Sequence, residues 1–156
     1  MMRVGVFSDT HGILANLSTA MALSGKLDAF VHLGDFSSDA EKISAIFSMP
    51  YYSVRGNCDY LSDSPRQQIV QFENASILLM HGDQLRSTTQ LSYLAEEQHC
   101  AAALFGHTHI PLLTAQGPLI ILNPGSLSLP RGGNKPSFAV LTIDGSDVDV
   151  KIISIA

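Results

Sequence analysis

The first third of the chain alternates short apolar runs with segments of helical periodicity. The apolar runs are rich in β-branched and aromatic side chains and end in polar turns, which predicts buried strands at residues 2–8, 28–33 and 51–55. The segments between them carry apolar side chains at three- and four-residue intervals, which predicts helices at residues 16–24 and 38–49. Strands that alternate with helices are typical of an α/β domain.

The ends of the predicted helices carry recognisable start and stop signals. Gly25 follows the first helix and Pro50 follows the second. The run Ser38-Asp39-Ala40-Glu41 predicts a capping box at the start of the second helix, and Ser87-Thr88-Thr89-Gln90 predicts another for a helix that continues to about residue 99.

The second half of the chain is richer in strands. A hairpin and a short buried strand are followed by a β-rich remainder, with strands expected at residues 67–72, 76–80, 101–105, 111–115, 119–122, 138–143 and 148–155. The segment from Asn123 to Gly133 is too rich in glycine and proline for regular structure, and we interpret it as a surface loop. The whole pattern predicts a single α/β domain over residues 1–156, with a mixed sheet or two packed sheets.

Composition narrows the function classes. Of the 156 residues, 46% are hydrophobic, which argues against disorder. The net charge is −5 and the nine basic residues are scattered, so no basic surface for long nucleic acid is indicated. Neither a signal peptide nor an apolar run long enough to span a bilayer is found, and Cys58 and Cys100 form no CxxC pair. We therefore expect a cytoplasmic protein without a membrane partner.

Polar side chains with metal-binding atoms follow five of the predicted strands. They are Asp9 and His11, then Asp35, Asn57 and His81, and finally His107 and His109. In α/β folds, ligands gather outside the carboxyl ends of the strands, so these side chains could share one pocket. A mixed set of carboxylate, imidazole and amide ligands suits manganese, iron or zinc better than calcium.

Each residue of this set also has an ordinary alternative. Asp9 alone could cap the following helix, Asp35 and Asn57 could form turns, and His11 and His81 could be histidines without a ligand. The pair His107 and His109 is harder to explain in that way, because two histidines on the same side of an extended segment favour metal. Two further histidines, His32 within a strand and His99 at a helix end, we interpret as structural.

Taken in order, these blocks resemble the calcineurin-like metallophosphoesterase superfamily. The matching blocks are Asp9-x-His11, Gly34-Asp35, Gly56-Asn57-x-Asp59, His81-Gly82 and Gly106-His107-x-His109. The short length, the Asn-Cys-Asp block and the Asn123-Pro124-Gly125-Ser126 loop with Pro130-Arg131 resemble its small YfcE-like branch. The resemblance implies a four-layer α-β-β-α sandwich with two mixed sheets.

The resemblance also implies a dinuclear metal centre and a reaction. One ion would be held by Asp9, His11, Asp35 and His109, and the other by Asp35, Asn57, His81 and His107, so that Asp35 bridges them. We expect Mn²⁺, with Zn²⁺, Fe²⁺, Ni²⁺ and Mg²⁺ as alternatives. The implied activity is that of a metal-dependent phosphodiesterase, in which a metal-bridging hydroxide attacks a small phosphodiester.

One position departs from the family pattern. Many members have a histidine after the asparagine of the third block, where it can protonate the leaving group, and this chain has Cys58. A thiol is a weaker donor, so Cys58 is either a catalytic group on the leaving-group side or a small filler, and the neighbouring Asp59 could assist. Arg131 could bind a substrate phosphate or be a solvated loop residue, and Arg55 has the same two interpretations.

Other functions remain as alternatives. A phosphomonoesterase or a nuclease of the same superfamily would use the same ligands, although a nuclease needs basic residues for its phosphate contacts. A non-catalytic scaffold of the same fold, like the small retromer subunit, is disfavoured because every ligand position holds a competent residue. The natural substrate, the metal used in the cell and the oligomeric state, including a homo-oligomer, are left open.

Overall fold

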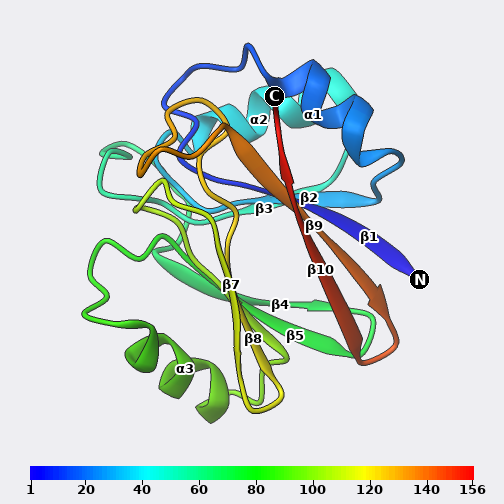
Figure 1. Ribbon diagram of the computed structural model, residues 1–156, viewed down its shortest axis with the longest axis vertical. Coiled ribbons are helices and arrows are strands. Elements are labelled where there is room, and N and C mark those ends of the chain that lie inside the picture. The colour runs from blue at the N-terminus through cyan, green and yellow to red at the C-terminus, as the bar shows by residue number, and fades with distance from the viewer.

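The computed structural model describes residues 1–156 and contains two five-stranded sheets packed face to face (Figure 1). Sheet A has the strand order β10-β9-β1-β2-β3 and sheet B the order β4-β5-β6-β8-β7. The strands of sheet A are β1 (Met2–Phe7), β2 (Ala29–His32), β3 (Tyr51–Ser53), β9 (Ser137–Asp144) and β10 (Asp147–Ser154). Those of sheet B are β4 (Gln67–Phe72), β5 (Ala75–Met80), β6 (Ala102–Leu104), β7 (Leu112–Gln116) and β8 (Leu119–Asn123).

The three helices of the chain cover the outer faces of the two sheets (Figure 1). Helices α1 (Leu17–Ser24) and α2 (Ser38–Phe47) pack on sheet A through a core that includes Leu17, Ile43 and Phe30. Helix α3 (Thr88–Glu97) packs on sheet B through Leu91 and Ile121. The expected α-β-β-α sandwich with two mixed sheets is therefore confirmed.

The largest buried cluster lies between the sheets and is shared by both. Val4 and Val6 of β1 face Ile77 and Leu79 of β5 across this layer, while Phe7 points to the helical side of sheet A. This division follows from the two-residue period of a strand, which sends successive side chains to opposite faces. Because both faces of β1 are covered, its sequence is a nearly continuous apolar run.

The parallel strands of both sheets end at one edge of the sandwich. Strands β1, β2 and β3 are mutually parallel in sheet A, as are β5, β6 and β8 in sheet B. The segments that follow β1, β2, β3, β5 and β6 carry the seven polar residues predicted as metal ligands. The fold thus brings together residues from positions 9 to 109.

The predicted capping box at Ser38 is wrong. Ser38 is the first residue of helix α2, and the preceding residue, Ser37, makes no side-chain cap. The reason is tertiary: the Ser37 hydroxyl hydrogen-bonds to the Ser62 hydroxyl at 2.8 Å, and the Ser37 amide donates to Asp59 Oδ1 at 2.7 Å. The second predicted cap is confirmed, because the Ser87 hydroxyl accepts from the Gln90 amide at the start of α3.

The segment from Asn123 to Gly133 is only partly the surface loop that its composition predicted. Asn123 ends β8, and the following residues through Leu127 are buried, whereas residues 131–133 are exposed. The Ser126 hydroxyl donates to the backbone carbonyl of Asp9 at 2.8 Å, and that of Ser128 donates to the carbonyl of Thr10. The segment is irregular because it supports the loop after β1.

Strand β7 differs from the other C-terminal strands in its exposure. All five of its residues are exposed, including Leu112 and Leu113, while β9 is buried over most of its length.

The chain contains no helix that is both long and apolar enough to cross a membrane.

Candidate metal centre

The side chains that follow the parallel strands form two overlapping groups. Within each group the possible ligand atoms lie within 4.8 Å of one another. The first group consists of Asp9, His11, Asp35 and His109, and the second of Asp35, His81 and His107. Asp35 belongs to both, and it is thereby placed between the two sets.

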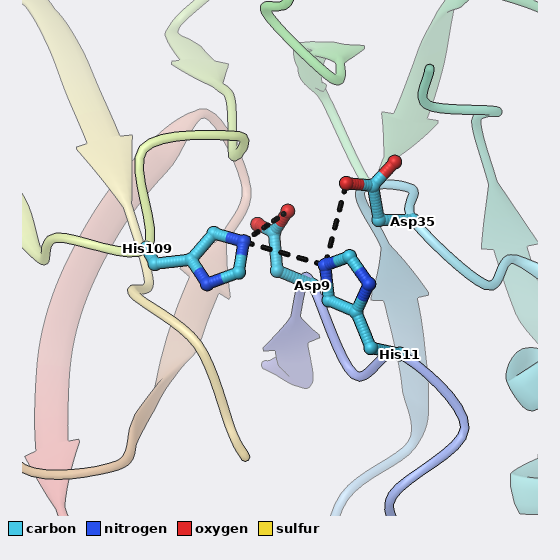
Figure 2. A group of neighbouring side chains, drawn as sticks. All are labelled: Asp9, His11, Asp35 and His109. Atoms are coloured by element: carbon cyan, nitrogen blue, oxygen red, sulfur yellow. Dashed lines mark hydrogen bonds and ion pairs between the residues drawn. The ribbon is translucent and has the colours of Figure 1, made fainter. Parts of the chain in front are cut away.

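The first group surrounds a small space between the loops after β1, β2 and β6 (Figure 2). His109 Nε2 lies 3.3 Å from Asp9 Oδ1 and 3.3 Å from His11 Nε2. His11 Nε2 lies 3.4 Å from Asp35 Oδ2. Figure 2 shows these side chains converging from separate elements, with oxygen and nitrogen atoms directed at one another. Such a set of donors is suited to one divalent cation.

The second group is arranged around His81. His81 Nε2 lies 3.4 Å from Asp35 Oδ1 and 3.1 Å from Asn57 Oδ1. The His107 ring stands edge-on to the His81 ring, with 5.2 Å between the ring centroids. Asn57, the remaining predicted ligand, therefore lies beside this group.

Backbone carbonyls fix the orientation of two histidines. His81 Nδ1 lies 2.7 Å from the Leu33 carbonyl, and His109 Nδ1 lies 2.6 Å from the Leu129 carbonyl. Because a carbonyl only accepts, Nδ1 carries the hydrogen in both rings, and in the neutral form Nε2 presents its lone pair to the site. This arrangement is common among metal-binding histidines, whose second nitrogen is held by a backbone or carboxylate oxygen.

Unpaired buried atoms support the same interpretation. Asp9 Oδ1 and His107 Nδ1 are both inaccessible to solvent and have no hydrogen-bond partner. In the neutral tautomer of His81, its Nε2 and Asn57 Oδ1 are two acceptors that face each other. Buried polar atoms without partners are costly, and cations at the two groups would satisfy Asp9 Oδ1 and His107 Nδ1 and would bind between the two facing acceptors. The residues therefore fit a divalent metal ion.

Charge interactions keep both carboxylates ionised. Burial raises the pKa of Asp9, but the close contact with His109 and the charge of His81 outweigh it, so the net pKa lies below the ordinary value. Burial acts in the same direction on Asp35, and hydrogen bonds from His81 and the Cys58 amide bring its pKa well below the usual range. Two carboxylates are thus available as anionic ligands.

The same pairs act in the opposite direction on the histidines. Burial lowers the pKa of His81, but the contacts of His81 with Asp35 and Asp9 raise the pKa by more than burial lowers it, so the net pKa is raised. The Asp9 contact raises the pKa of His109. Both shifts favour the protonated imidazole, so metal binding at these histidines is coupled to the release of protons.

The backbone at the site adopts a conformation that is rare for residues other than glycine. Asp9, His11, Asp35, His107 and His109 all have φ between 48° and 71°. Such conformations cost free energy, and they occur where the surrounding structure holds them for a function. Five of the seven predicted ligands are therefore held in a left-handed backbone conformation.

Comparison with known proteins identifies the family. Residues 2–146 match the model of the calcineurin-like phosphoesterase superfamily domain. The chain belongs to this superfamily. It is thereby a metal-dependent phosphoric ester hydrolase, as the resemblance of its sequence blocks implied.

Two relatives and one solved structure are similar to the chain over most of its length. It is 33% identical to a probable metallophosphoesterase of Methanothermobacter thermautotrophicus, with 97% of this chain and 92% of that protein covered. It is 29% identical to the phosphodiesterase YfcE of Escherichia coli K12, with 92% and 89% covered. The crystal structure of Vps29 from Entamoeba histolytica, complexed with zinc, aligns with a TM-score of 0.80 over 98% of this chain and 99% of that one. At 21% identity, the Vps29 likeness shows the fold alone.

Several supporting residues of this phosphoesterase site were not found from the sequence. The Ser8 hydroxyl donates to Asp9 Oδ2 at 2.6 Å. The Asn123 amide donates to the Gly106 carbonyl and to the Thr108 hydroxyl, both at 3.0 Å. These two bonds fix the loop after β6, which carries His107 and His109. The sequence contained one indication of the role of Asn123, because the block Asn123-Pro124-Gly125-Ser126 resembled the family and had no function assigned to it.

The four remaining candidates stand in different positions. Cys58 is part-buried, its amide donates to Asp35 Oδ1 at 3.0 Å, and burial together with Asp35 raises the pKa of its thiol. Asp59 uses both carboxylate oxygens for backbone amides, those of Ser37 and Gly56, which makes it a structural residue. Arg131 is exposed, and its amide donates to the His109 carbonyl. Arg55 has a buried Nε without a partner.

His32 is the last residue of β2, three positions before the predicted ligand Asp35, and it is fully buried. The Gly34 amide donates to its Nδ1 at 3.2 Å, so Nε2 carries the hydrogen and donates to the Thr10 hydroxyl at 2.8 Å. Burial lowers its pKa to about 4. His32 therefore stays neutral and connects β2 to the loop that carries Asp9 and His11.

We expect this histidine to make the chelator-stripped protein less stable in acid. Its stabilising contribution is fully present above pH 6.5 and is lost as the pH falls from 6.5 to about 4, because there only the unfolded chain takes up the proton. The loss amounts to about 3 kcal/mol of unfolding free energy. Urea unfolding of the wild type and of His32→Gln between pH 7 and 4 measures it as the difference in pH dependence. An NMR titration of His32 with a midpoint near 6.5 would contradict this prediction.

Gly56 is required by the space available at the centre. A Cβ at this position would overlap Asp35 Oδ1 and would lie 2.7 Å from the Asp35 amide nitrogen and 2.9 Å from His81 Cδ2. We expect Gly56→Ala to lower the unfolding free energy by about 1–3 kcal/mol and to reduce metal content, because Asp35 and His81 must move. Gly117→Ala is the comparison variant: its φ of 58° makes alanine costly there, but no atom lies within 4 Å of its Cβ, so it should lose stability without losing metal content. Full metal content in Gly56→Ala would show that the close contact is relieved elsewhere.

Proposed function

We propose that this protein is a phosphodiesterase that hydrolyses a small phosphodiester at a centre with two divalent cations. The observation that carries the proposal is the position of Asp35, whose two carboxylate oxygens face different ligand groups. A carboxylate shared in this way suits two ions about 3.5–4 Å apart, the spacing at which paired cations act on phosphate esters.

Seven side chains would hold the ions. We assign Asp9, His11, Asp35 and His109 to the first ion and Asp35, Asn57, His81 and His107 to the second. Mn²⁺ is our proposed cofactor, because the set mixes oxygen and nitrogen donors, and Zn²⁺, Fe²⁺, Ni²⁺ and Mg²⁺ are the ions to compare with it. When bound, the pair of ions supplies a nucleophile by acidifying water and neutralises the charge on the phosphate.

The protein's own residues contribute orientation and proton control. The carbonyls of Leu33 and Leu129 hold His81 and His109 with Nε2 directed at the centre. The raised pKa of the Cys58 thiol keeps it protonated at neutral pH, so we assign it as a weak donor on the leaving-group side. We assign Arg131 to the substrate phosphate, since it follows the loop beside His109 and a guanidinium matches phosphate geometry.

The location of the protein in the cell is a further proposal. Both thiols, those of Cys58 and Cys100, are free. Free thiols are typical of a reducing compartment, and this supports a cytoplasmic protein.

Restoration of activity by metal tests the function. The protein is stripped with a chelator, supplied with Mn²⁺, Zn²⁺ or Mg²⁺ singly, and assayed on bis-p-nitrophenyl phosphate beside p-nitrophenyl phosphate. We expect metal-restored cleavage with the diester preferred. Preference for the monoester would make the protein a phosphomonoesterase. Absence of turnover with two ions bound per chain would instead favour a scaffold role and a search for protein partners.

A further inference from the structure

A cavity of about 580 Å³, lined by eight polar and five hydrophobic residues, adjoins the metal centre on the side of Cys58. Cys58 lines this cavity, and its amide also donates to Asp35 Oδ1 at 3.0 Å. Phe36 lines it as well, and its ring centroid lies 5.6 Å from that of His11. The cavity therefore lies within reach of one alcohol arm of a diester at the centre, and its volume suits a small ligand.

The lining of this cavity carries negative charge without compensation. Glu41, Asp59 and Asp63 line it, and the lining contains no lysine, arginine or histidine. None of the three carboxylates forms an ion pair. Since backbone amides occupy both oxygens of Asp59, the exposed carboxylates of Glu41 and Asp63 are the ones free to act on a ligand. An arm with a further negative charge would be repelled here.

Hydroxyl groups dominate the rest of the lining. Ser37 and Ser62 form one hydroxyl pair at 2.8 Å, and Ser53 and Ser64 form another at 2.7 Å. Each such pair uses one of its two O–H groups internally and has the other available as a donor, and the Ser62 oxygen also accepts from the Ser64 amide at 3.1 Å. The exposed side chain of Tyr60 adds an aromatic face at the rim. Donors, acceptors and an aromatic face together match an alcohol that carries several hydroxyl groups.

The cavity on the other flank of the centre has a different character. It measures about 480 Å³, lies beside His107, and is lined by Leu85, Phe105 and Leu112 together with Arg86 and Asp83. An apolar arm or one with a negative charge has partners there. Only the cavity beside Cys58 is therefore expected to select against a substrate arm that carries a negative charge.

We propose that the cavity beside Cys58, which we call the serine cavity, selects the substrate. It takes an uncharged alcohol arm with several hydroxyl groups, of the sugar or polyol type, and rejects an arm that carries a further phosphate or carboxylate. This inference rests on the proposed phosphodiesterase function and names the substrate class of the same site.

Three symmetric diesters with three-carbon arms test the selection, because one arm of each must face the serine cavity. They are bis(2,3-dihydroxypropyl), dipropyl and bis(2-carboxyethyl) phosphate, titrated into the Zn²⁺-loaded, ¹⁵N-labelled protein. The amide signals of residues 62–64 are followed, and ³¹P spectra verify that each diester is intact at every point used. We expect the dihydroxypropyl diester to bind about 10-fold more tightly than the carboxyethyl diester and about 3-fold more tightly than the dipropyl diester. Equal binding of the carboxyethyl diester, or unmoved signals of residues 62–64, would overturn the proposal.

A pair of charge variants locates the effect. In Glu41→Gln/Asp63→Asn we expect the carboxyethyl diester to bind about 5–10-fold more tightly and the dihydroxypropyl diester about 2–3-fold more weakly. Asp147→Asn/Asp149→Asn, on the exposed side of β10, removes the same charge elsewhere and should change neither. Identical behaviour of the two variants would also overturn the proposal. Because binding is measured directly, failure of the metal-restored hydrolysis assay would remove the phosphodiesterase function and leave this result intact.

Discussion

Replacing Asp35 by asparagine is expected to lower kcat/KM for metal-dependent diester hydrolysis by at least about 10³-fold. Asp35 Oδ2 lies 3.4 Å from His11 Nε2, and Oδ1 lies 3.4 Å from His81 Nε2, so the carboxylate serves both ligand groups. An amide in its place is neutral, and its nitrogen cannot bind a cation. The variant would leave Asp9 as the one carboxylate of the predicted ligand set, with two ions to hold.

The measurement pairs kinetics with elemental analysis. We expect Asp35→Asn to retain at most one ion per chain, whereas Asp147→Asn, which removes the same charge on the exposed side of β10, keeps both ions and full activity. Far-ultraviolet circular dichroism checks that the variant is folded. If Asp35→Asn keeps more than a tenth of wild-type activity with two bound ions, Asp35 is not the bridge.

Saturation with metal is expected to raise the melting temperature by at least about 8–16 °C, the shift expected for one filled site. A single site filled at 1,000 times its dissociation constant adds about 4 kcal/mol to the unfolding free energy, and a chain of this length gains about 2–4 °C per kcal/mol. The ligands explain why binding requires the folded state. Asp9 follows β1 of sheet A and His109 follows β6 of sheet B, so the unfolded chain holds them far apart.

Calorimetric melts of the chelated and the Mn²⁺-saturated protein measure this stabilisation. His109→Ala serves as the matched variant, because it removes one ligand of the first group, and we expect it to lose at least half of the shift. An equal shift in His109→Ala would mean that Mn²⁺ binds elsewhere on the surface, and the assignment of the first group as metal ligands would be wrong.

Much of the site could be predicted because parallel strands deliver their following residues to one edge. The apolar runs before Asp9, Asp35 and His81 were recognisable as strands, and the structure brings these side chains together as the sequence blocks implied. Whether they bind metal stays a prediction. The fold followed from the same alternation of strands and helices, together with the family resemblance.

Other features depended on contacts that a local pattern does not encode. The Ser38 capping box failed because the Ser37 hydroxyl and amide are engaged by Ser62 and Asp59, which lie on a distant loop. The buried half of the Asn123 to Gly133 segment escaped notice because glycine and proline usually mark exposed turns. Its burial follows from the hydrogen bond between Ser126 and the Asp9 carbonyl.

The backbone conformation of the ligands was equally hidden. Positive φ is expected of glycine and asparagine, and here it occurs at Asp9, Asp35 and three histidines. Long-range hydrogen bonds hold these residues, as between the Asp9 amide and the Gly34 carbonyl. His32, assigned correctly to a structural role, owes its low pKa to complete burial, which its sequence neighbours alone do not reveal.

The position of β1 has a consequence for how the protein is synthesised. Its two neighbours in sheet A are β2, made almost at once, and β9, made near the end, since Gly5 pairs with Val140. A chain emerging from the ribosome therefore presents the Asp9 loop early, on a strand with one open edge, and closes that edge only when β9 has been released. The last predicted ligand, His109, precedes β9 in the chain, so all seven ligands have been made while this edge of β1 is still open.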